Sequence, residues 1–345
     1  MNVEEEFGKY IAQQDLCKPQ DRVIVAVSGG KDSMLMAYLF IHAGYDCVLA
    51  HCNFQLRAEA SDLDEALVAA FAKRHNIPFY VTHFDTTAYA AAHKLSIQMA
   101  ARELRYRWFE ELRQQQQAQV IAIAQHQNDH IETMLLNLTR VTGLQGLHGI
   151  RPKRAYLIRP LLFMPAAEVA EAVAQRHIPY RDDQSNFSTK YARNKIRLEI
   201  VPKFKEIQPD FEQVLTQSIT HFQESYALLQ HFVDPLRKDL FEAMPHGRIR
   251  IDKERLAPNI AVPGLLYALF KPYGFTAEVL QDLSASWSHE SGRLFESASH
   301  RLLLDRDSLW MAAREQPVVA AQRIQEQERS IVFGRYQFNF EESTD

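Results

Sequence analysis

Residues 22–33 read Arg-Val-Ile-Val-Ala-Val-Ser-Gly-Gly-Lys-Asp-Ser, an apolar run that ends in a short polar loop with two adjacent glycines. An apolar run of this length, closed by Ser-Gly-Gly, predicts a strand that is buried on both faces at residues 22–27. Residues 33–42 continue with helical periodicity and end before Gly44. The stretch therefore predicts a strand, a glycine loop and a helix in direct succession.

Strands and helices alternate through the first 140 residues. The same reasoning predicts further strands at residues 47–52, 79–84 and 120–124, and helices at residues 63–75, 98–116 and 129–140. Ser61 and Asp62 are candidate caps for the first of these helices. Close alternation predicts an α/β fold with a doubly wound parallel sheet and helices on both faces. Ligands of such sheets bind beyond the carboxyl ends of the strands, where the polar motifs fall.

The pattern changes after Pro165. A helix is predicted at residues 166–177, followed by a polar, basic stretch and by helical periodicity at residues 211–240. The chain then stays mostly helical to residue 288, and two apolar runs around residues 305–307 predict a hairpin. We expect a first domain at residues 1–208, a helical domain at 209–290 and a small β-containing segment at 291–345. A strand-like ending before the last residues leaves truncation of this segment open.

The composition is that of an ordinary globular protein. The 345 residues are 46% hydrophobic and 24% charged, with a net charge of −4. Three cysteines without a CxxC pair argue against a disulfide scaffold or a thiolate metal site and suit a reducing cytoplasm. The acidic N-terminus does not resemble a signal peptide, and no stretch is apolar enough to span a bilayer. We therefore expect a cytoplasmic protein without a membrane partner.

Positive charge is concentrated in one segment of the sequence. Residues 151–205 contain twelve Lys or Arg and five Asp or Glu, a net charge of +7 in a chain that is acidic overall. Such a segment is either a solvated surface or a patch for nucleic acid, and charge alone does not separate the two.

The loop at residues 28–33 has the groups that bind a phosphate. Its glycines let the backbone approach an anion closely, and N–H groups opening the next helix point toward the same place. Ser28 and Ser33 add hydroxyl donors, Lys31 a positive charge and Asp32 a candidate Mg²⁺ ligand. The GxxxxGK[ST] pattern of kinases and GTPases is absent, and a plain glycine turn is the alternative. The predicted nucleotide site consists of Ala26, Val27, Ser28, Gly29, Gly30, Lys31, Asp32, Ser33 and Asn53.

The loop resembles the PP-loop of the ATP pyrophosphatase superfamily, whose members cleave ATP between its α and β phosphates to adenylate a substrate. Five further stretches resemble motifs of one family within it, tRNA(Ile)-lysidine synthetase. They are HCNFQLR at residues 51–57, ARELRY at 101–106, QHQNDHIET at 125–133, RPLL at 159–162, and DQSN at 183–186 with YARNKIR at 191–197. The resemblance covers residues 23–202, with the motifs in order. It implies that residues 1–208 form the catalytic domain and that the helical domain at 209–290 binds tRNA.

This resemblance implies a reaction in two steps with ATP and Mg²⁺. The wobble cytidine of a tRNA(Ile) with a CAU anticodon is adenylated at its C2 carbonyl oxygen. Free L-lysine then displaces AMP through its ε-amine, which leaves lysidine in the anticodon. The sequence leaves open whether the chain works as a homodimer.

The implied catalytic residues are Asp32, Lys31, Asp129, Glu132 and Arg102. Asp129 and Glu132 are three residues apart and share one helical face. They are candidates to hold an amine, to complete a Mg²⁺ site with Asp32, or to accept a proton, and the sequence does not rank these roles. Arg102 is a candidate phosphate ligand, or else a surface arginine paired with Glu103.

Two further groups of residues have alternative interpretations. Asn53 either lines the nucleotide pocket or caps a loop. Arg193, Asn194 and Arg197 lie in the basic segment and are predicted to contact the phosphates or riboses of tRNA, which would make tRNA binding salt dependent.

Four positions depart from the family's pattern. Gln55 replaces a histidine, Ala58 and Val141 each replace a glycine, and Asn128 replaces the first acid of an Asp-Asp pair. An amide binds a cation more weakly than a carboxylate does. If the acid at position 128 is a ligand, affinity for Mg²⁺ or lysine falls; if the pair is partly redundant, little changes.

Three other functions share parts of the sequence pattern. A tRNA 2-thiolation enzyme also uses SGGKDS, but residues 96–100 lack the cysteines that would hold an iron–sulfur cluster. A synthetase of the GMP synthetase kind would need a glutaminase domain, which is not visible. A tRNA-binding relative without catalytic activity is the third, prompted by Asn128.

Overall fold

The chain folds into two compact units, residues 1–226 and 227–345. The computed structural model describes residues 2–57, 59–140, 142–182, 192–288, 291–314, 330–333 and 336–339. No helix within these ranges has the length and apolarity needed to cross a membrane.

The first unit is built on a six-stranded sheet in the order β3-β2-β1-β4-β6-β5. All neighbours are parallel except β5 and β6. The strands are β1 (Val23–Ala26), β2 (Cys47–Asn53), β3 (Phe79–His83), β4 (Val120–Ala122), β5 (Lys153–Arg154) and β6 (Leu157–Ile158). The fold is therefore the predicted α/β type with a doubly wound, mainly parallel sheet.

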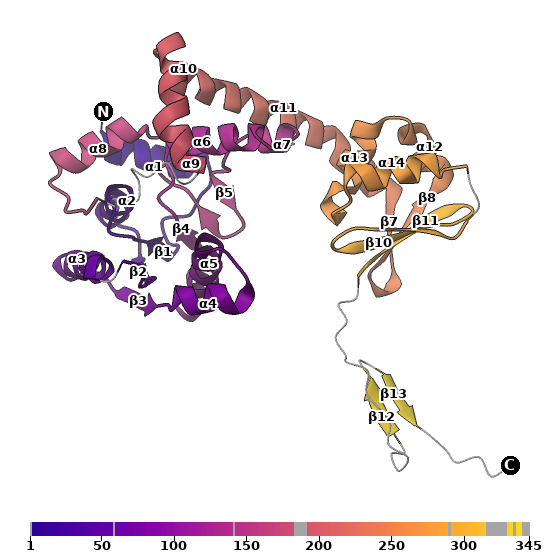
Figure 1. Cartoon of the computed structure of the whole chain (residues 1–345), viewed down its shortest axis with the longest axis horizontal. Helices are drawn as coiled ribbons and strands as arrows, with labels where there is room; N and C mark the ends of the chain where they lie inside the picture. The colour runs from indigo at the N-terminus through magenta and orange to yellow at the C-terminus, as the bar shows by residue number, and fades with distance from the viewer. Residues whose placement is uncertain are drawn as a thin grey trace. The chain divides into compact units, whose positions relative to one another are not determined.

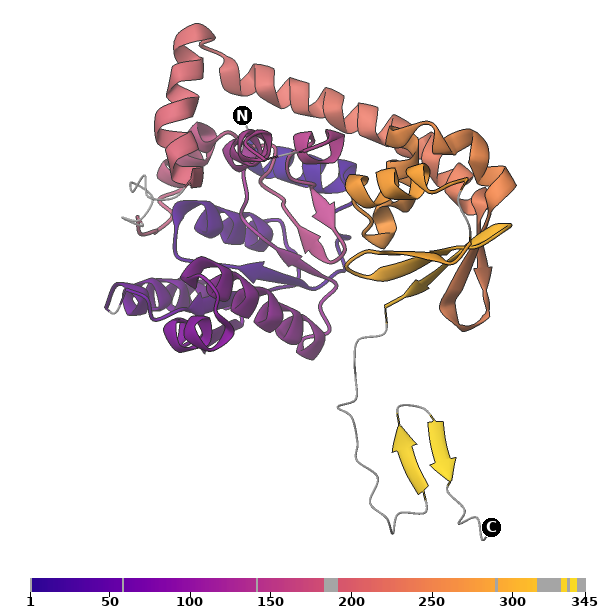
Figure 2. The ribbon, with the colours of Figure 1, turned by 45° about the vertical axis from the view of Figure 1, so that its right-hand side comes forward.

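Helices cover both faces of this sheet (Figures 1 and 2). The helices of this unit are α1 (Val3–Gln13), α2 (Lys31–His42), α3 (Glu59–His75), α4 (Thr86–His93), α5 (Ile97–Gln115), α6 (Gln127–Leu138), α7 (Leu144–Leu147), α8 (Ala166–Gln175), α9 (Ala192–Lys195), α10 (Val201–Ile207) and the start of α11 (Phe211–Leu240), with a π-helical turn at Ile196–Ile200.

Successive side chains of β1 point alternately to the two faces of the sheet, so this strand contributes to the core on each face. Val23 and Val25 join the core formed with α1, α2, α3 and α8, whereas Ile24 joins the core formed with α5. All three are fully buried. A short strand buried on both sides reads as a continuous apolar run, so the sequence pattern predicted it correctly.

The strands and helices predicted for the first unit are confirmed, but α3 begins earlier than predicted, and the sequence analysis did not predict α1, α4, α7, α9, α10, β5 or β6. Helix α3 begins at Glu59, so Ser61 and Asp62 lie within its first turn and are not caps. Helix α4 was not predicted because its eight residues are short and alanine-rich. Strands β5 and β6 were not predicted because two residues each are too few to show a period.

The start of α11 belongs to the first unit. Its residues Leu215, Ile219 and Phe222 pack against Ile131 and Met134 of α6. The compact unit therefore extends to residue 226 and not to the predicted boundary at residue 208.

The second unit contains an antiparallel sheet in the order β7-β8-β11-β10-β9. Its elements are β7 (Phe241–Met244), β8 (Arg248–Asp252), α12 (Lys253–Ile260), α13 (Pro263–Phe270), α14 (Ala277–Ala285), β9 (Arg293–Glu296), β10 (His300–Leu304) and β11 (Ser308–Ala313), and β12 (Ser330–Phe333) pairs separately with β13 (Tyr336–Asn339). The core of this unit includes Ile251, Leu302 and Leu309 from the sheet and Leu256, Leu269 and Leu283 from the helices.

The hairpin predicted around residues 305–307 is confirmed as β10 and β11. The chain before residue 290 is mostly helical, as predicted, but β7 and β8 also lie there. They pair with each other, and β8 pairs with β11. The predicted division at residue 290 therefore cuts through one sheet. The alternation Arg248-Ile249-Arg250-Ile251 was the available signal for β8.

Candidate active site

The loop between β1 and α2 is held in shape by its own serines. The Ser33 hydroxyl donates to the Gly30 carbonyl at 2.9 Å and accepts from the Ser28 N–H at 3.0 Å, and the two hydroxyls lie 3.1 Å apart. Gly30 is the N-cap of α2, and within the described chain no side chain caps this helix. The N-terminus of α2 thus keeps the N–H groups and dipole that favour a bound anion.

Gly29 lets the loop pass close to α3. Its φ of +88° is a conformation that only glycine adopts easily, and a Cβ placed on it would lie 3.3 Å from the Asp64 Cβ. Asp64 is fixed in turn by Arg57 at 3.0 Å and Arg181 at 2.8 Å. The Arg181 N–H also donates to the Gly29 carbonyl at 3.0 Å. Three segments of the chain therefore set the position of this glycine.

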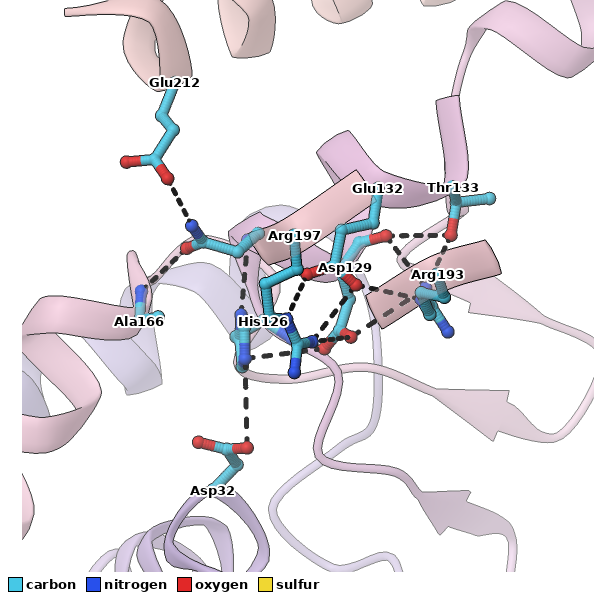
Figure 3. Close-up of polar contacts among 10 residues, drawn as sticks. Asp32, His126, Asp129, Glu132, Thr133, Ala166, Arg193, Arg197 and Glu212 are labelled. Atoms are coloured by element: carbon cyan, nitrogen blue, oxygen red, sulfur yellow. Dashed lines mark hydrogen bonds and ion pairs between the residues drawn. The ribbon is translucent and has the colours of Figure 1, made fainter. Parts of the chain in front are cut away.

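A histidine lies between two carboxylates at the edge of the sheet (Figure 3). The His126 Nε2 is 3.8 Å from Asp32 Oδ2 and 3.7 Å from Asp129 Oδ2. Its Nδ1 accepts the Asn128 N–H at 3.2 Å, so the ring proton of the neutral form lies on Nε2 and faces the carboxylates. Burial raises the pKa of Asp32, whose Oδ1 is buried without a hydrogen-bond partner among the described residues.

Glu132 is buried and neutralised by two arginines (Figure 3). It is 1% exposed and receives the Arg193 Nε at 2.9 Å and the Arg197 Nε at 2.5 Å. The guanidinium groups also lie 3.8 and 3.7 Å from Asp129 Oδ1. A buried carboxylate that is already paired with two cations has little capacity left to hold a third. Asp129 is the more open of the two acids.

Family models and known relatives identify the family to which the chain belongs. A model described as "PP-loop domain" matches residues 1–204, and one described as "TilS substrate binding domain" matches residues 245–314. A tRNA(Ile)-lysidine synthase of Parabacteroides distasonis is 40% identical over 306 residues, which are 89% of this chain and 69% of the relative. The chain belongs to the tRNA(Ile)-lysidine synthase family. Another synthase of this family, from Chlorobaculum tepidum, is 34% identical over 84% of this chain and 90% of its own length.

A solved structure supports the fold. The U34-tRNA thiolase NcsA of Methanococcus maripaludis, solved with its [4Fe-4S] cluster, aligns with a TM-score of 0.52. It is 18% identical and covers 64% of this chain and 79% of its own. At this identity the likeness concerns the PP-loop fold alone.

The structure places the predicted site residues in three groups. Ala26 ends β1, Val27 is buried after it, and the loop residues and Asp32 share the edge of the sheet with Asp129. Lys31 opens α2 and is partly exposed. Arg193 of α9 and Arg197 of the π-helical turn lie against Glu132, while Asn194, in α9 with Arg193, is half-buried. Whether these three residues contact tRNA stays a prediction of the lysidine synthase resemblance.

Arg102 and Asn53 stand apart from the loop. Arg102 lies on the exposed side of α5, with its guanidinium 4.8 Å from the centroid of the Tyr106 ring, and has no polar contact to the loop among the described residues. Asn53 is buried and donates to Asp62 and Glu65 at 3.1 and 2.9 Å, while its Oδ1 accepts the Gln55 N–H. These contacts favour the loop-capping interpretation of Asn53.

His126 and Asp64 were missed as individual site residues. His126 was available from its position directly after the fourth strand, within the motif that supplied Asp129. Asp64 carried no signal, because its importance comes from contact with Gly29 on another element. Of the departures from the lysidine synthase pattern, Ala58 and Val141 lie outside the described residues, as does the motif at residues 183–186.

Proposed function

We propose that this chain is an ATP-dependent ligase that attaches lysine to C2 of the wobble cytidine of tRNA(Ile). The observation that carries the proposal is the SGGKDS loop at the edge of the sheet, with Asp32 facing His126 and Asp129, in a chain of the lysidine synthase family. A tRNA 2-thiolation reaction is not favoured, since relatives that are 40% and 37% identical to this chain are lysidine synthases.

In the first step the cytidine C2 oxygen bonds to the α-phosphorus of ATP and pyrophosphate leaves. The loop and the N-terminus of α2 bind the phosphates and stabilise the charge that develops on the leaving group. Lys31 supplies a mobile positive charge there. In the second step the lysine ε-amine bonds to C2, AMP leaves with the oxygen, and the amine loses a proton.

Mg²⁺ fits the residues at this edge. Asp32 Oδ1 is a buried oxygen without a partner among the described residues, and Asp129 lies across His126 from it. No group of three or more His, Cys, Asp or Glu spaced as metal ligands occurs in the described ranges. A site with one or two carboxylates is the kind that Mg²⁺ occupies when phosphates complete its coordination, and the ion would neutralise phosphate charge when bound.

Asp129 is the best candidate to receive the lysine amine. It is a carboxylate at the reacting edge, whereas Glu132 is already paired with both arginines. His126 is placed to move a proton, because its Nε2 faces both acids. We assign Glu132 a supporting role in fixing Arg193 and Arg197, whose side chains remain 38% and 36% exposed toward a phosphate ligand.

We propose that tRNA binds through the basic segment and through the second unit. The segment at residues 151–205 carries the net positive charge that a phosphate backbone requires. The second unit matches a substrate-binding domain over residues 245–314. We further propose that residues 1–208 form the catalytic part, that the protein is cytoplasmic and that it forms a homodimer.

The test is pyrophosphate release with cognate tRNA. The parent should release pyrophosphate only when tRNA(Ile) and ATP are both present, and Asp32→Ala should lower the rate by at least about 100-fold. Asp46→Ala, at the exposed Arg22 pair, is the control and should stay within about twofold. Activity of Asp32→Ala near that of the parent would contradict the role of the loop. Salt-sensitive tRNA binding by an inactive parent would instead indicate a binding protein.

A further inference from the structure

The side chain of Asn128 joins three helices. Its Oδ1 accepts the N–H of Ala166, the first residue of α8, at 2.8 Å. Its Nδ2 donates to Oε1 of Glu212, in the first turn of α11, at 2.6 Å. Asn128 itself is the second residue of α6. One amide therefore connects the N-terminal turns of α6, α8 and α11.

Each partner requires a particular half of the amide. Helix α8 begins after Pro165, which has no side-chain acceptor, so the Asn128 oxygen serves as the missing cap for the Ala166 N–H. Glu212 can only accept while it is ionised, and its second oxygen already receives the Lys205 ammonium at 2.8 Å. The two contacts thus fix which end of the amide is oxygen and which is nitrogen.

An ionised carboxylate cannot replace this side chain. An ionised aspartate at position 128 would still accept the Ala166 N–H, but its other oxygen would face the Glu212 carboxylate without a proton between them. Like charges at that distance raise the pKa of one member of the pair until it holds a proton. The position therefore calls for one donor and one acceptor, which an amide supplies at every pH.

The catalytic edge depends on the same turn of α6. The Asn128 N–H donates to His126 Nδ1 at 3.2 Å, and the His126 N–H donates to Asp129 Oδ2 at 3.0 Å. A shift of Asn128 would move both groups relative to Asp32.

We propose that Asn128 is a positioning residue, which holds His126 and Asp129 in place by tying α6 to α8 and α11. The Asn128–Glu212 pair then takes the place of an acid at this position, and Asn128 is neither a Mg²⁺ ligand nor a lysine ligand. This inference rests on the proposed lysidine-forming function.

The test is the pH dependence of Asn128→Asp. The groups facing position 128 are Glu212 and Lys205 from α11 and α10, and His126 and Asp129 from its own turn. At pH 8 the variant should lose at least about tenfold in kcat, and most of the loss should disappear toward pH 6, where the pair holds a shared proton. The KM for lysine should change much less than kcat.

Rescue and control variants separate positioning from general damage. Glu212→Gln added to Asn128→Asp should restore kcat at pH 8 to within about threefold of the parent, because the glutamine amide donates to the new carboxylate. Asn137→Asp, also on α6, is the control, since the Asn137 amide donates to the Gly146 carbonyl of α7 and not to a carboxylate. Its activity should show no recovery toward pH 6.

Two results would overturn the proposal. The first is an Asn128→Asp protein that matches or exceeds the parent at pH 8 with tighter Mg²⁺ or lysine binding, because position 128 would then be a ligand position. The second is a loss that neither low pH nor Glu212→Gln relieves. The unfolding temperature of the variants over the same pH range reports on the pair independently of lysidine formation. An inactive parent would therefore refute the proposed function and still leave the pairing testable.

Discussion

Replacing Gly29 by alanine tests whether the loop is held against α3 as the structure indicates. Gly44, near the other end of α2, provides a matched control. Both glycines have positive φ, +88° and +77°, but a Cβ on Gly44 meets nothing within 4 Å. The two substitutions therefore share the conformational penalty and differ in crowding.

The expected magnitudes follow from these contacts. A positive φ costs a residue with a Cβ about 1–2 kcal/mol, and we expect Gly44→Ala to destabilise the protein by about 1 kcal/mol. In Gly29→Ala the new Cβ would lie 3.3 Å from Asp64 Cβ and 3.5 Å from the Asp64 carbonyl. Because Arg57 and Arg181 hold Asp64, it cannot retreat without weakening two ion pairs. We expect a loss of about 2–3 kcal/mol in the free energy of unfolding.

Urea unfolding and pyrophosphate release measure the two consequences. Gly29→Ala should lower kcat/KM for ATP by at least about tenfold, since the backbone that approaches the phosphates must shift, whereas Gly44→Ala should stay within about twofold. Equal stability losses for the two variants would show that Asp64 does not restrict the loop. Equal ATP kinetics would refute the assignment of the phosphate site.

Three further predictions concern buried polar groups. Glu132→Gln leaves Arg193 and Arg197 without their counter-charge, so we expect the free energy of unfolding in urea to fall by about 2–3 kcal/mol. The control Glu110→Gln breaks a partly exposed helix pair with Arg113 and should lose at most about 1 kcal/mol. A larger loss for Glu110→Gln than for Glu132→Gln would contradict the buried cluster. Burial lowers the pKa of His130 to about 4, so between about pH 6.5 and 4 the unfolded chain binds a proton that the folded chain does not. The free energy of unfolding should therefore fall by at most about 3 kcal/mol as the pH drops through this window. His130→Asn should flatten this pH dependence, and an unchanged dependence would refute the assignment to His130. Ser33→Ala removes the acceptor of the Ser28 N–H and the donor to the Gly30 carbonyl, so the rate of pyrophosphate release should fall at least about tenfold. The control Ser218→Ala loses only a hydrogen bond to the Val214 carbonyl on α11 and should remain within about twofold of the parent. Equal rates for the two variants would show that the Ser33 hydrogen bonds do not fix the loop.

The sequence predicted the parts of the fold that follow local rules. The apolar run at residues 23–26 is a buried strand in the structure, the glycine loop that follows it leads into α2, and the periodicity of residues 211–240 matches α11 in full. The motif after the fourth strand placed Asp129 at the same edge as Asp32, because parallel strands present their carboxyl ends together.

Contacts between distant segments set the limits of sequence reasoning. That Arg193 and Arg197 neutralise Glu132 depends on how the polar stretch folds back onto α6, which no local pattern encodes. The partners of Asn128 lie 38 and 84 residues away, so the sequence showed a missing acid without showing the amide bonds that replace it. The second unit was divided at the wrong place because the pairing of β8 with β11 spans three helices.

Lysine transfer to tRNA tests the central claim most directly. Purified protein, ATP, Mg²⁺ and labelled L-lysine are incubated with a tRNA(Ile) transcript carrying a CAU anticodon, and AMP and tRNA-bound lysine are measured together. The account predicts equal amounts of both products, no tRNA-bound lysine without ATP, and no transfer to a transcript whose wobble cytidine is replaced by uridine. Release of AMP without lysine on the tRNA, or equal labelling of both transcripts, would contradict it.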